Sequence, residues 1–352
     1  MGARVLLARI MRLTTSLRIA SLLSLTAFAV ACGGSTPSGL SGADAGPVDP
    51  SGTGTTIVGT EDPDAAVPNG QTDSCTKIDF VFVVDNSGSM SEEQQNLGTN
   101  FPRFVTAIEA FRTRSGLPLD YRLAVTTTGI SHTITIPDQQ IPGFPIPLPG
   151  QTIRETGEDG AFQEQSSCGM SRRWLQKGDA NVAQNFACVA EVGTDGASFE
   201  MPLEGMKRSL VDRVTDGTNA GFLRTDALLA LIFLTDEDDC STAATSFTAK
   251  DDSCAPPPPG LVSIPEYLTT LDTVKGGGAA GRSRWASAVI AGPNDCDSSF
   301  GSARTATRML EFVRQAGTNA VFSSICAGNL SAGLTSALGT FKAACDNFQP
   351  PR

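Results

Sequence analysis

The apolar run Ile78–Val84 ends in the pentapeptide Asp-Asn-Ser-Gly-Ser at 85–89, and this junction constrains the chain more than any other segment. Seven residues rich in Val and Phe, stopped by Asp-Asn-Ser-Gly, predict a strand buried on both faces, as in a parallel sheet. Asp85, Ser87 and Ser89 then place a carboxylate and two hydroxyls at alternate positions on a tight turn. Small oxygen ligands of this kind suit a hard divalent cation such as Mg²⁺. The junction therefore predicts a metal site at the end of a central strand.

Apolar strand patterns and amphipathic helix patterns alternate along the chain after this junction. Strands are expected at Ile78–Val84, Tyr121–Thr127, Ala227–Leu234, Trp285–Ala291 and Val321–Ile325. Helices are expected over Ser91–Arg114, Phe199–Leu210, Ala306–Val313 and Leu334–Phe341. Such alternation predicts an α/β fold with a doubly wound, mainly parallel sheet flanked by helices.

Two long stretches, 133–190 and 236–281, interrupt the alternation, and each holds a pair of cysteines. Long ordered loops in compact domains are usually functional. Tolerated surface insertions, held by disulfides, are an equally open interpretation. His132 stands at the edge of the first stretch in a turn-like Ser-His-Thr context, and we expect it at the surface.

The N-terminal segment has the features of an export signal. The first 31 residues carry four arginines and no acid, then an apolar stretch too short to span a bilayer. Ala29-Val30-Ala31-Cys32 resembles a bacterial lipobox, which would make Cys32 the lipidated residue; ordinary cleavage after Ala31 would instead leave it a spare thiol. Residues 32–74 are mostly small or polar and predict a disordered tether. We therefore expect a signal peptide at 1–31, a tether at 32–74 and a folded domain at 75–349.

The cysteine count fits an oxidising compartment. Nine cysteines are present, and setting aside Cys32 leaves eight that can form four disulfides: Cys75, Cys168, Cys188, Cys240, Cys254, Cys296, Cys326 and Cys345. We expect the two short pairings, Cys168 with Cys188 and Cys240 with Cys254, and leave the others open. With one histidine and no Cys-x-x-Cys, a zinc site is not expected.

The charge balance bears on the class of partner. The formal net charge is −11, and without the four arginines of the signal the remaining 22 basic and 37 acidic residues give −15. An acidic chain of this kind disfavours nucleic acid or an anionic membrane surface as a partner.

Two further loops are expected near the Asp85 turn. Asp236 almost directly follows the apolar run that ends at Leu234, and Thr194 lies in a glycine-flanked loop before the expected Phe199 helix. Ligands of doubly wound sheets bind beyond the carboxyl ends of the strands, so the three loops should converge there. The acidic run 237–239 leaves open a second cation site beside the first.

This pattern resembles the von Willebrand factor A (VWA) domain and its metal-ion-dependent adhesion site (MIDAS), over about Lys77–Cys345. The resemblance implies a six-strand sheet with Mg²⁺, Mn²⁺ or Ca²⁺ held by Asp85, Ser87, Ser89, Thr194 and Asp236. It implies that the hydroxyls bind the ion directly, that the aspartates often act through water, and that an open position remains for a partner's carboxylate. The two cysteine-bearing insertions depart from the family pattern.

Lipobox, tether and disulfide-held domain together resemble envelope lipoproteins of diderm bacteria. The expected function is therefore binding rather than catalysis: a lipid-anchored protein, in the outer membrane, whose domain binds an acidic protein or surface polymer through a metal ion. A scaffold with an unused metal site is one alternative. A metal-dependent hydrolase is another, although an aspartyl phosphatase would typically place a second acid where Ser87 stands.

Overall fold

The computed structural model describes residues 75–351 except 114, 141, 144, 251–253, 255–256, 299–300 and 328–329. The expected signal peptide, lipidated Cys32 and tether lie outside the described residues. Among the residues that are described, no helix combines the length and apolarity that crossing a bilayer requires.

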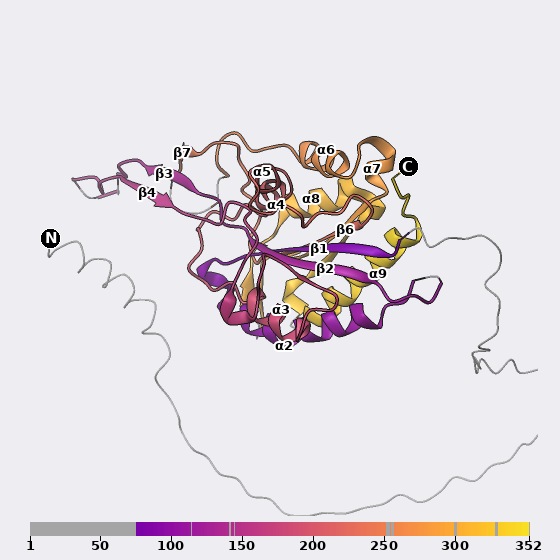
Figure 1. The fold of residues 1–352 in the computed structure, drawn as a ribbon. Helices are drawn as coiled ribbons and strands as arrows, with labels where there is room; N and C mark the ends of the chain where they lie inside the picture. The colour runs from indigo at the N-terminus through magenta and orange to yellow at the C-terminus, as the bar shows by residue number, and fades with distance from the viewer. Residues whose placement is uncertain are drawn as a thin grey trace, which may run out of the picture. The chain divides into compact units, whose positions relative to one another are not determined.

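The main sheet is built on the strand that the sequence singled out. Within the described residues it has six strands in the order β11-β8-β6-β1-β2-β5, parallel except for β5, which is antiparallel to β2 (Figure 1). The strands are β1 (Lys77–Val84), β2 (Asp120–Thr127), β5 (Leu175–Gln176), β6 (Leu228–Leu234), β8 (Trp285–Ala291) and β11 (Ala320–Ser324). The five parallel strands lie within one residue of the expected bounds, and the doubly wound α/β class is confirmed. The edge strand β5 comes from the first cysteine-bearing stretch and was not expected.

Strand β1 joins two hydrophobic layers because its successive side chains point to opposite faces of the sheet. Phe80 and Phe82 belong to one layer, whereas Val81 and Val83 belong to the other, and all four are at most 1% exposed. Strands buried on both faces need a continuous apolar run, which explains why the period-2 alternation of a half-exposed strand is absent here.

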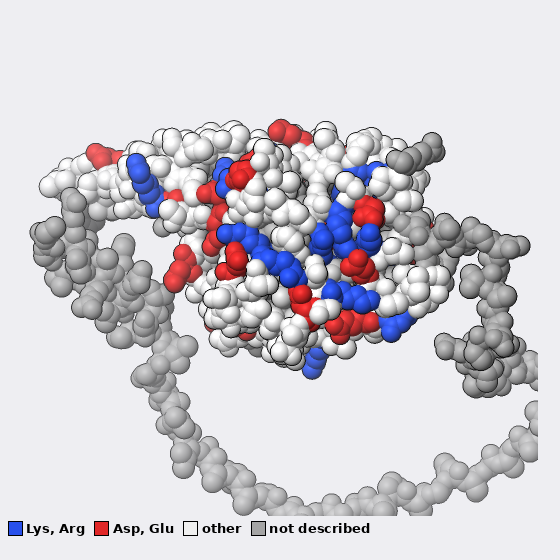
Figure 2. All heavy atoms as spheres, viewed as in Figure 1, with Lys and Arg blue, Asp and Glu red and all other residues white. Residues whose placement is uncertain are grey.

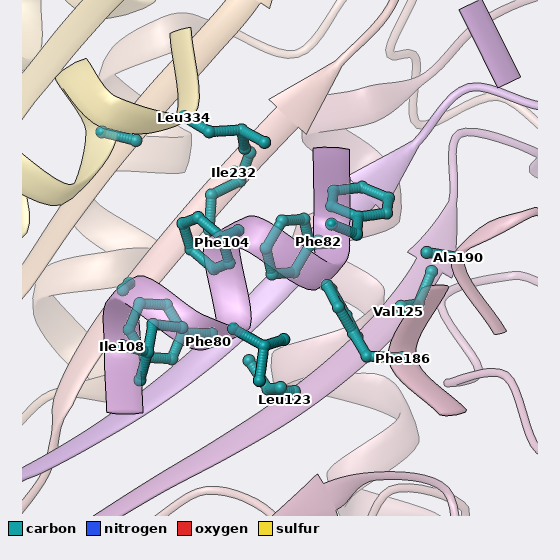
Figure 3. Packing of buried hydrophobic residues seen from close by; sticks show 14 of the residues in the cluster. Phe80, Phe82, Phe104, Ile108, Leu123, Val125, Phe186, Ala190, Ile232 and Leu334 are labelled. Atoms are coloured by element: carbon teal, nitrogen blue, oxygen red, sulfur yellow. The ribbon is translucent and has the colours of Figure 1, made fainter. Parts of the chain in front are cut away.

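Helices α2 (Ser91–Ala110), α3 (Val182–Ala190) and α9 (Leu330–Asp346) cover the layer that contains Phe82 (Figure 1). The Phe82 ring packs edge-on against Phe101 and Phe104 of α2, at centroid distances of 5.3 and 5.4 Å, and tilted against Phe186 of α3 (Figure 3). Aromatic pairs favour such edge-on geometry. Helix α2 ends at Ala110, four residues before the expected end.

The opposite side of the sheet is covered by the remaining helices (Figure 1): α4 (Pro202–Leu210), α5 (Asp212–Thr215), α6 (Ile264–Val274), α7 (Gly278–Arg282) and α8 (Thr307–Ala316). The predicted helix beginning at Phe199 was wrong in its first turn, since α4 starts with Pro202, a residue suited to a first helical position. Phe199 lies before the helix and packs in a separate cluster.

The two interrupting stretches pair with each other. Strands β3 (His132–Ile136), β4 (Gln151–Glu155) and β7 (Ser246–Thr248) form a second sheet in the order β4-β3-β7, whose cluster includes Ile134, Phe199 and Phe247. The expectation that His132 lies at the surface was wrong. It is 4% exposed, stacks on Phe247 at 5.3 Å and places Nδ1 2.7 Å from the Ile130 carbonyl oxygen.

Four disulfides hold the described domain: Cys75–Cys345, Cys168–Cys188, Cys240–Cys254 and Cys296–Cys326. The two short pairings expected from the sequence are confirmed. Cys296 lies in the hairpin β9 (Cys296–Ser298) and β10 (Gly301–Ala303), and the remaining short elements are the 3₁₀ turns η1 (Gly88–Met90), η2 (Ser166–Cys168), η3 (Gly317–Asn319) and η4 (Ile325–Ala327).

Disulfide removal should cost more stability where the bond closes a longer loop, with a cost that rises as the logarithm of the loop length. Replacing Cys75 and Cys345 together by Ala frees a separation of 270 residues and should lower the free energy of unfolding by about 5 kcal/mol. The same change at Cys168 and Cys188, separated by 20 residues, should cost about 3 kcal/mol. Urea denaturation of the two double variants measures both values; a larger loss from the short loop would contradict the expectation.

Candidate metal centre

The candidate site lies at the carboxyl edge of the sheet, between its two central strands. Val84 of β1 pairs with Leu234 of β6, so the residues that follow both strands emerge side by side. The chain runs from β1 to β2 on one side of the sheet and later to β6 on the other, which makes this the topological switch point. The backbone N–H of Asp85 donates to the carbonyl oxygen of Leu234 at 2.9 Å and holds the two turns together.

The Asp85 turn is fixed by hydrogen bonds to both oxygens of a buried carboxylate. The backbone N–H of Ser87 donates to Oδ1 at 2.8 Å, and the Thr235 hydroxyl, from the β6 turn, donates to Oδ2 at 2.7 Å. The Ser87 and Ser89 hydroxyls lie 2.9 Å apart, so the three side chains of the predicted triplet share one turn. Burial raises the pKa of Asp85, against these hydrogen bonds.

Asp236 joins this turn from the neighbouring strand end. Its carboxylate accepts a hydrogen bond from Ser89, while Oδ1 is buried without a hydrogen-bond partner. Burial, the negative charge of Asp85 and those of Glu237 and Glu93 raise the pKa of Asp236 to about 8. Such a carboxyl is proton-bound near neutral pH unless a cation compensates its charge.

The predicted Thr194 loop reaches the same place through its backbone. The N–H of Gly196 donates to the carbonyl oxygen of Asn86 at 2.7 Å, and a side chain on Gly196 would collide with that oxygen, 2.6 Å from the position of a Cβ. The Thr194 carbonyl oxygen lies close to Gly88. All three predicted loops therefore meet at one edge, and Thr194 itself is half-buried there.

The sequence interpretation missed Glu200, which contributes a further carboxylate. It is 1% exposed, and neither Oε1 nor Oε2 has a hydrogen-bond partner. Burial raises its pKa well above the ordinary value, and the charges of Asp85, Glu237 and Asp236 raise it further. An acid between the large apolar residues Phe199 and Met201 was the available signal, because such a position is rarely solvated.

The side chains at this edge are carboxylates and hydroxyls, and this composition limits which metals they could bind. Within the described ranges, no group of three or more His, Cys, Asp and Glu side chains is arranged to hold a metal ion by itself. A cation at this edge therefore needs the hydroxyls of Ser87 and Ser89 in addition to carboxylates. Oxygen-only sets with several neutral members are typical of Mg²⁺ and Ca²⁺ rather than of softer metals.

The idea of a second cation site in the run 237–239 was wrong. Asp238 accepts the backbone N–H of Arg308 in the first turn of α8, at 2.8 Å. Asp239 pairs with the Arg308 side chain at 3.0 Å and accepts the Ser241 hydroxyl. Both carboxylates are thus committed to holding α8 and the 235–241 turn.

Comparisons with known proteins report likeness in fold. No protein-family model matches the chain, and no curated protein matches it. Similar solved structures include the pilus adhesin SpaC of Lactobacillus rhamnosus GG (12% identity, TM-score 0.37, 78% of this chain and 30% of that one). They include proximal thread matrix protein 1 of the mussel byssus with a zinc-occupied MIDAS motif (12%, 0.32, 78% and 47%). Manganese-loaded TRAP of Plasmodium vivax is a third (11%, 0.32, 77% and 74%). The chain spans about a third to a half of the length of the first two.

The raised pKa of Asp236 predicts a pH-dependent stability in the presence of chelator. The folded protein holds a proton on Asp236 up to about pH 8, whereas the unfolded chain releases it near 3.8, so stability is lost as pH rises between these values. We expect the free energy of unfolding in EDTA to fall by about 2 kcal/mol or more from pH 5 to pH 8. Asp236→Asn should flatten this dependence; an unchanged slope in that variant would exclude Asp236 as its source.

Proposed function

We propose that this domain binds a partner through a divalent cation, Mg²⁺ or alternatively Mn²⁺ or Ca²⁺, held at the carboxyl edge of the sheet. The observation that carries the proposal is the group of carboxylates buried there: Asp85, Glu93, Glu200 and Asp236 are each at most 3% exposed. Among them, Glu93, Glu200 and Asp236 have carboxylate oxygens without a hydrogen-bond partner. Buried, unpaired acids are costly, and a cation is the simplest group that compensates them.

Each residue has a role in the proposed site. Ser87 and Ser89 offer hydroxyl ligands, with Thr194 or Glu200 supplying the ligand from the third loop. Asp85 holds the turn through the backbone N–H of Ser87, Asp236 interacts with the Ser89 side chain, and both would orient any bound waters. When bound, the divalent cation would supply a positive charge that attracts a carboxylate of the partner. No turnover is needed for this role.

The charge around the site refines the sequence interpretation. A shell of hydroxyls alone would leave the cation strongly undercompensated, but Glu200 adds a buried carboxylate that the motif did not contain. The attraction for a bare carboxylate is therefore weaker than the Asp85, Ser87 and Ser89 pattern alone implies.

The proposed setting is the outer membrane, with export by the N-terminal signal and lipid anchoring at Cys32. The partner is then an acidic protein or surface polymer, and the role is adhesion or protein binding. In the view of Figure 2, acidic and basic side chains are interleaved over the surface. The face drawn therefore gives no support for a nucleic-acid partner, which would need a basic surface.

Substitutions in the turn should remove metal binding without unfolding the domain. Ser89→Ala and Asp236→Ala should each weaken Mg²⁺ binding at least about 100-fold by calorimetry, because a hydroxyl ligand or its orienting carboxylate is lost. Ser91→Ala, an exposed serine two residues further on, is the matched control and should bind as the native protein does. Native Mg²⁺ affinity in Ser89→Ala, Ser87→Ala and Asp236→Ala would sink the proposal.

Two further variants distinguish Thr194 from Glu200 as the ligand that the third loop supplies. Glu200→Gln should weaken Mg²⁺ binding yet stabilise the chelated protein at pH 8 and above, since it removes a buried acid whose ionisation the fold opposes. Thr194→Ala should weaken binding only if its hydroxyl is the ligand.

Affinity capture tests the binding role itself. The domain, immobilised in Mg²⁺ and exposed to envelope extract, should retain partners that EDTA releases, while the Asp236→Ala domain should retain none of them. Retention that is indifferent to both EDTA and Asp236→Ala would favour a scaffold with an unused metal site. Hydrolysis of a phosphoester by the native domain, lost in Asp236→Ala, would favour an enzyme.

A further inference from the structure

A cleft of about 500 Å³ opens directly beside the proposed metal site. One wall consists of Ser89, Asp236 and Glu237 from the metal-site turns. The other wall is the β9–β10 hairpin and its flanks, which contribute Asp295, Asp297, Ser302 and Arg304 among others. A group that binds at the metal site would therefore have its neighbouring atoms beside the hairpin.

The hairpin is held in a fixed position relative to the metal site. The backbone N–H of Arg304 donates to the carbonyl oxygen of Asp236 at 2.7 Å. Gly301, at φ +114°, lies against the Glu93 carboxylate, so a side chain there would be strained and would displace that carboxylate. The Cys296–Cys326 disulfide ties the strand β9 to the turn after β11. These contacts hold the described strands of the hairpin beside the metal-site turns.

The charge of the cleft lining is predominantly negative. Four carboxylates and one guanidinium line it, and one bound dication would still leave a net negative charge. Arg304 compensates little, because its side chain is 76% exposed and its Nη1 lies 3.5 Å from Asp295. Asp297 accepts only the neutral Ser302 hydroxyl, at 2.7 Å. The unpartnered Oδ1 of Asp236, a residue 2% exposed, belongs to the metal-site wall of this cleft, whereas Asp295 and Asp297 on the hairpin wall are exposed.

We propose that the ligand of this site carries a cationic group next to its carboxylate, and that Asp297 recognises the cation. Asp295 is already engaged, since its Oδ1 accepts the N–H and the hydroxyl of Thr305 and its Oδ2 faces Arg304. This inference rests on the proposed metal-dependent function and names its ligand class: a peptide or polymer with paired opposite charges rather than a purely acidic one. The carboxylate goes to the metal side of the cleft, and a lysine, arginine or amino-sugar ammonium goes to the hairpin side. Two fixed points of opposite charge give selectivity that a single metal contact lacks.

The test uses capped peptides as probes. One series carries an Asp and a Lys separated by glycine spacers of varied length, and the matched series has Gly in place of Lys. Binding to the whole domain is measured by fluorescence anisotropy in Mg²⁺ and in EDTA. We expect the best Lys-containing peptide to bind roughly fivefold tighter than its Gly counterpart, as a partly exposed ion pair provides.

Substitutions in the β9–β10 hairpin test whether Asp297 causes the preference for Lys-containing peptides. Asp297→Asn should abolish the difference between the two series, and Asp297→Lys should reverse it in favour of a Glu-containing series. Peptide binding is compared at saturating Mg²⁺, with the Mg²⁺ affinity of each variant measured by calorimetry, so that a change in metal occupancy is separated from loss of the cation contact. Asp346→Asn, an exposed acid paired with Lys342 at the end of α9, is the matched control and should keep the preference.

Equal binding of the Lys and Gly series to the native domain would overturn the inference while leaving the metal site intact. Native Mg²⁺ affinity with no peptide bound in either series would overturn it as well. Absence of Mg²⁺ binding in the native domain would instead overturn the proposed function, and this inference with it.

Discussion

Electrostatic repulsion among buried acids is the constraint on which the candidate site depends. Asp85, Glu93, Glu200 and Asp236 come from separate segments, yet the fold brings them to one edge of the sheet, where water can no longer screen their charges. The apolar layers on both sides of β1 supply the free energy that holds them there. Without a counterion, protons are the remaining means of neutralisation, which links metal binding, proton binding and stability in this domain.

The sheet could be predicted because its signals are local and strong. The strands β1, β6 and β8 are apolar runs buried along almost their whole length, so neither the class nor their bounds depended on distant contacts. The edge strand β5 has two residues and no periodicity to detect. Phe199 was assigned to a helix because its spacing to Leu203 fits a helical period, whereas in the fold Phe199 joins the cluster beneath the small sheet, and Pro202 begins the helix.

The site residues that could be predicted from the sequence are those that come directly after a strand. Asp85 comes directly after one apolar run, and Asp236 comes one residue after another. Parallel strands bring their carboxyl ends together, so these two residues were expected to lie close. Glu200 follows no strand, so no such rule applied, and its position depends on packing between the second sheet and α4. The N–H of Cys240, in the stretch 236–281, donates to the Glu200 carbonyl oxygen at 2.8 Å. The stretches 133–190 and 236–281, which form the second sheet, therefore help to position the site and are not only surface insertions.

The position of the first disulfide has a mechanical consequence. Cys75 lies just before β1, and Asp85 of the candidate site lies directly after it. If the chain before Cys75 and a bound partner are pulled apart, the force is therefore applied at the two ends of β1. Because the site also includes Asp236 after β6, part of the pull passes from β1 to β6, and the ladder between these two strands would be loaded in shear, with several hydrogen bonds resisting together. The bond to Cys345 passes part of that tension into α9. An architecture of this kind is suited to bearing force.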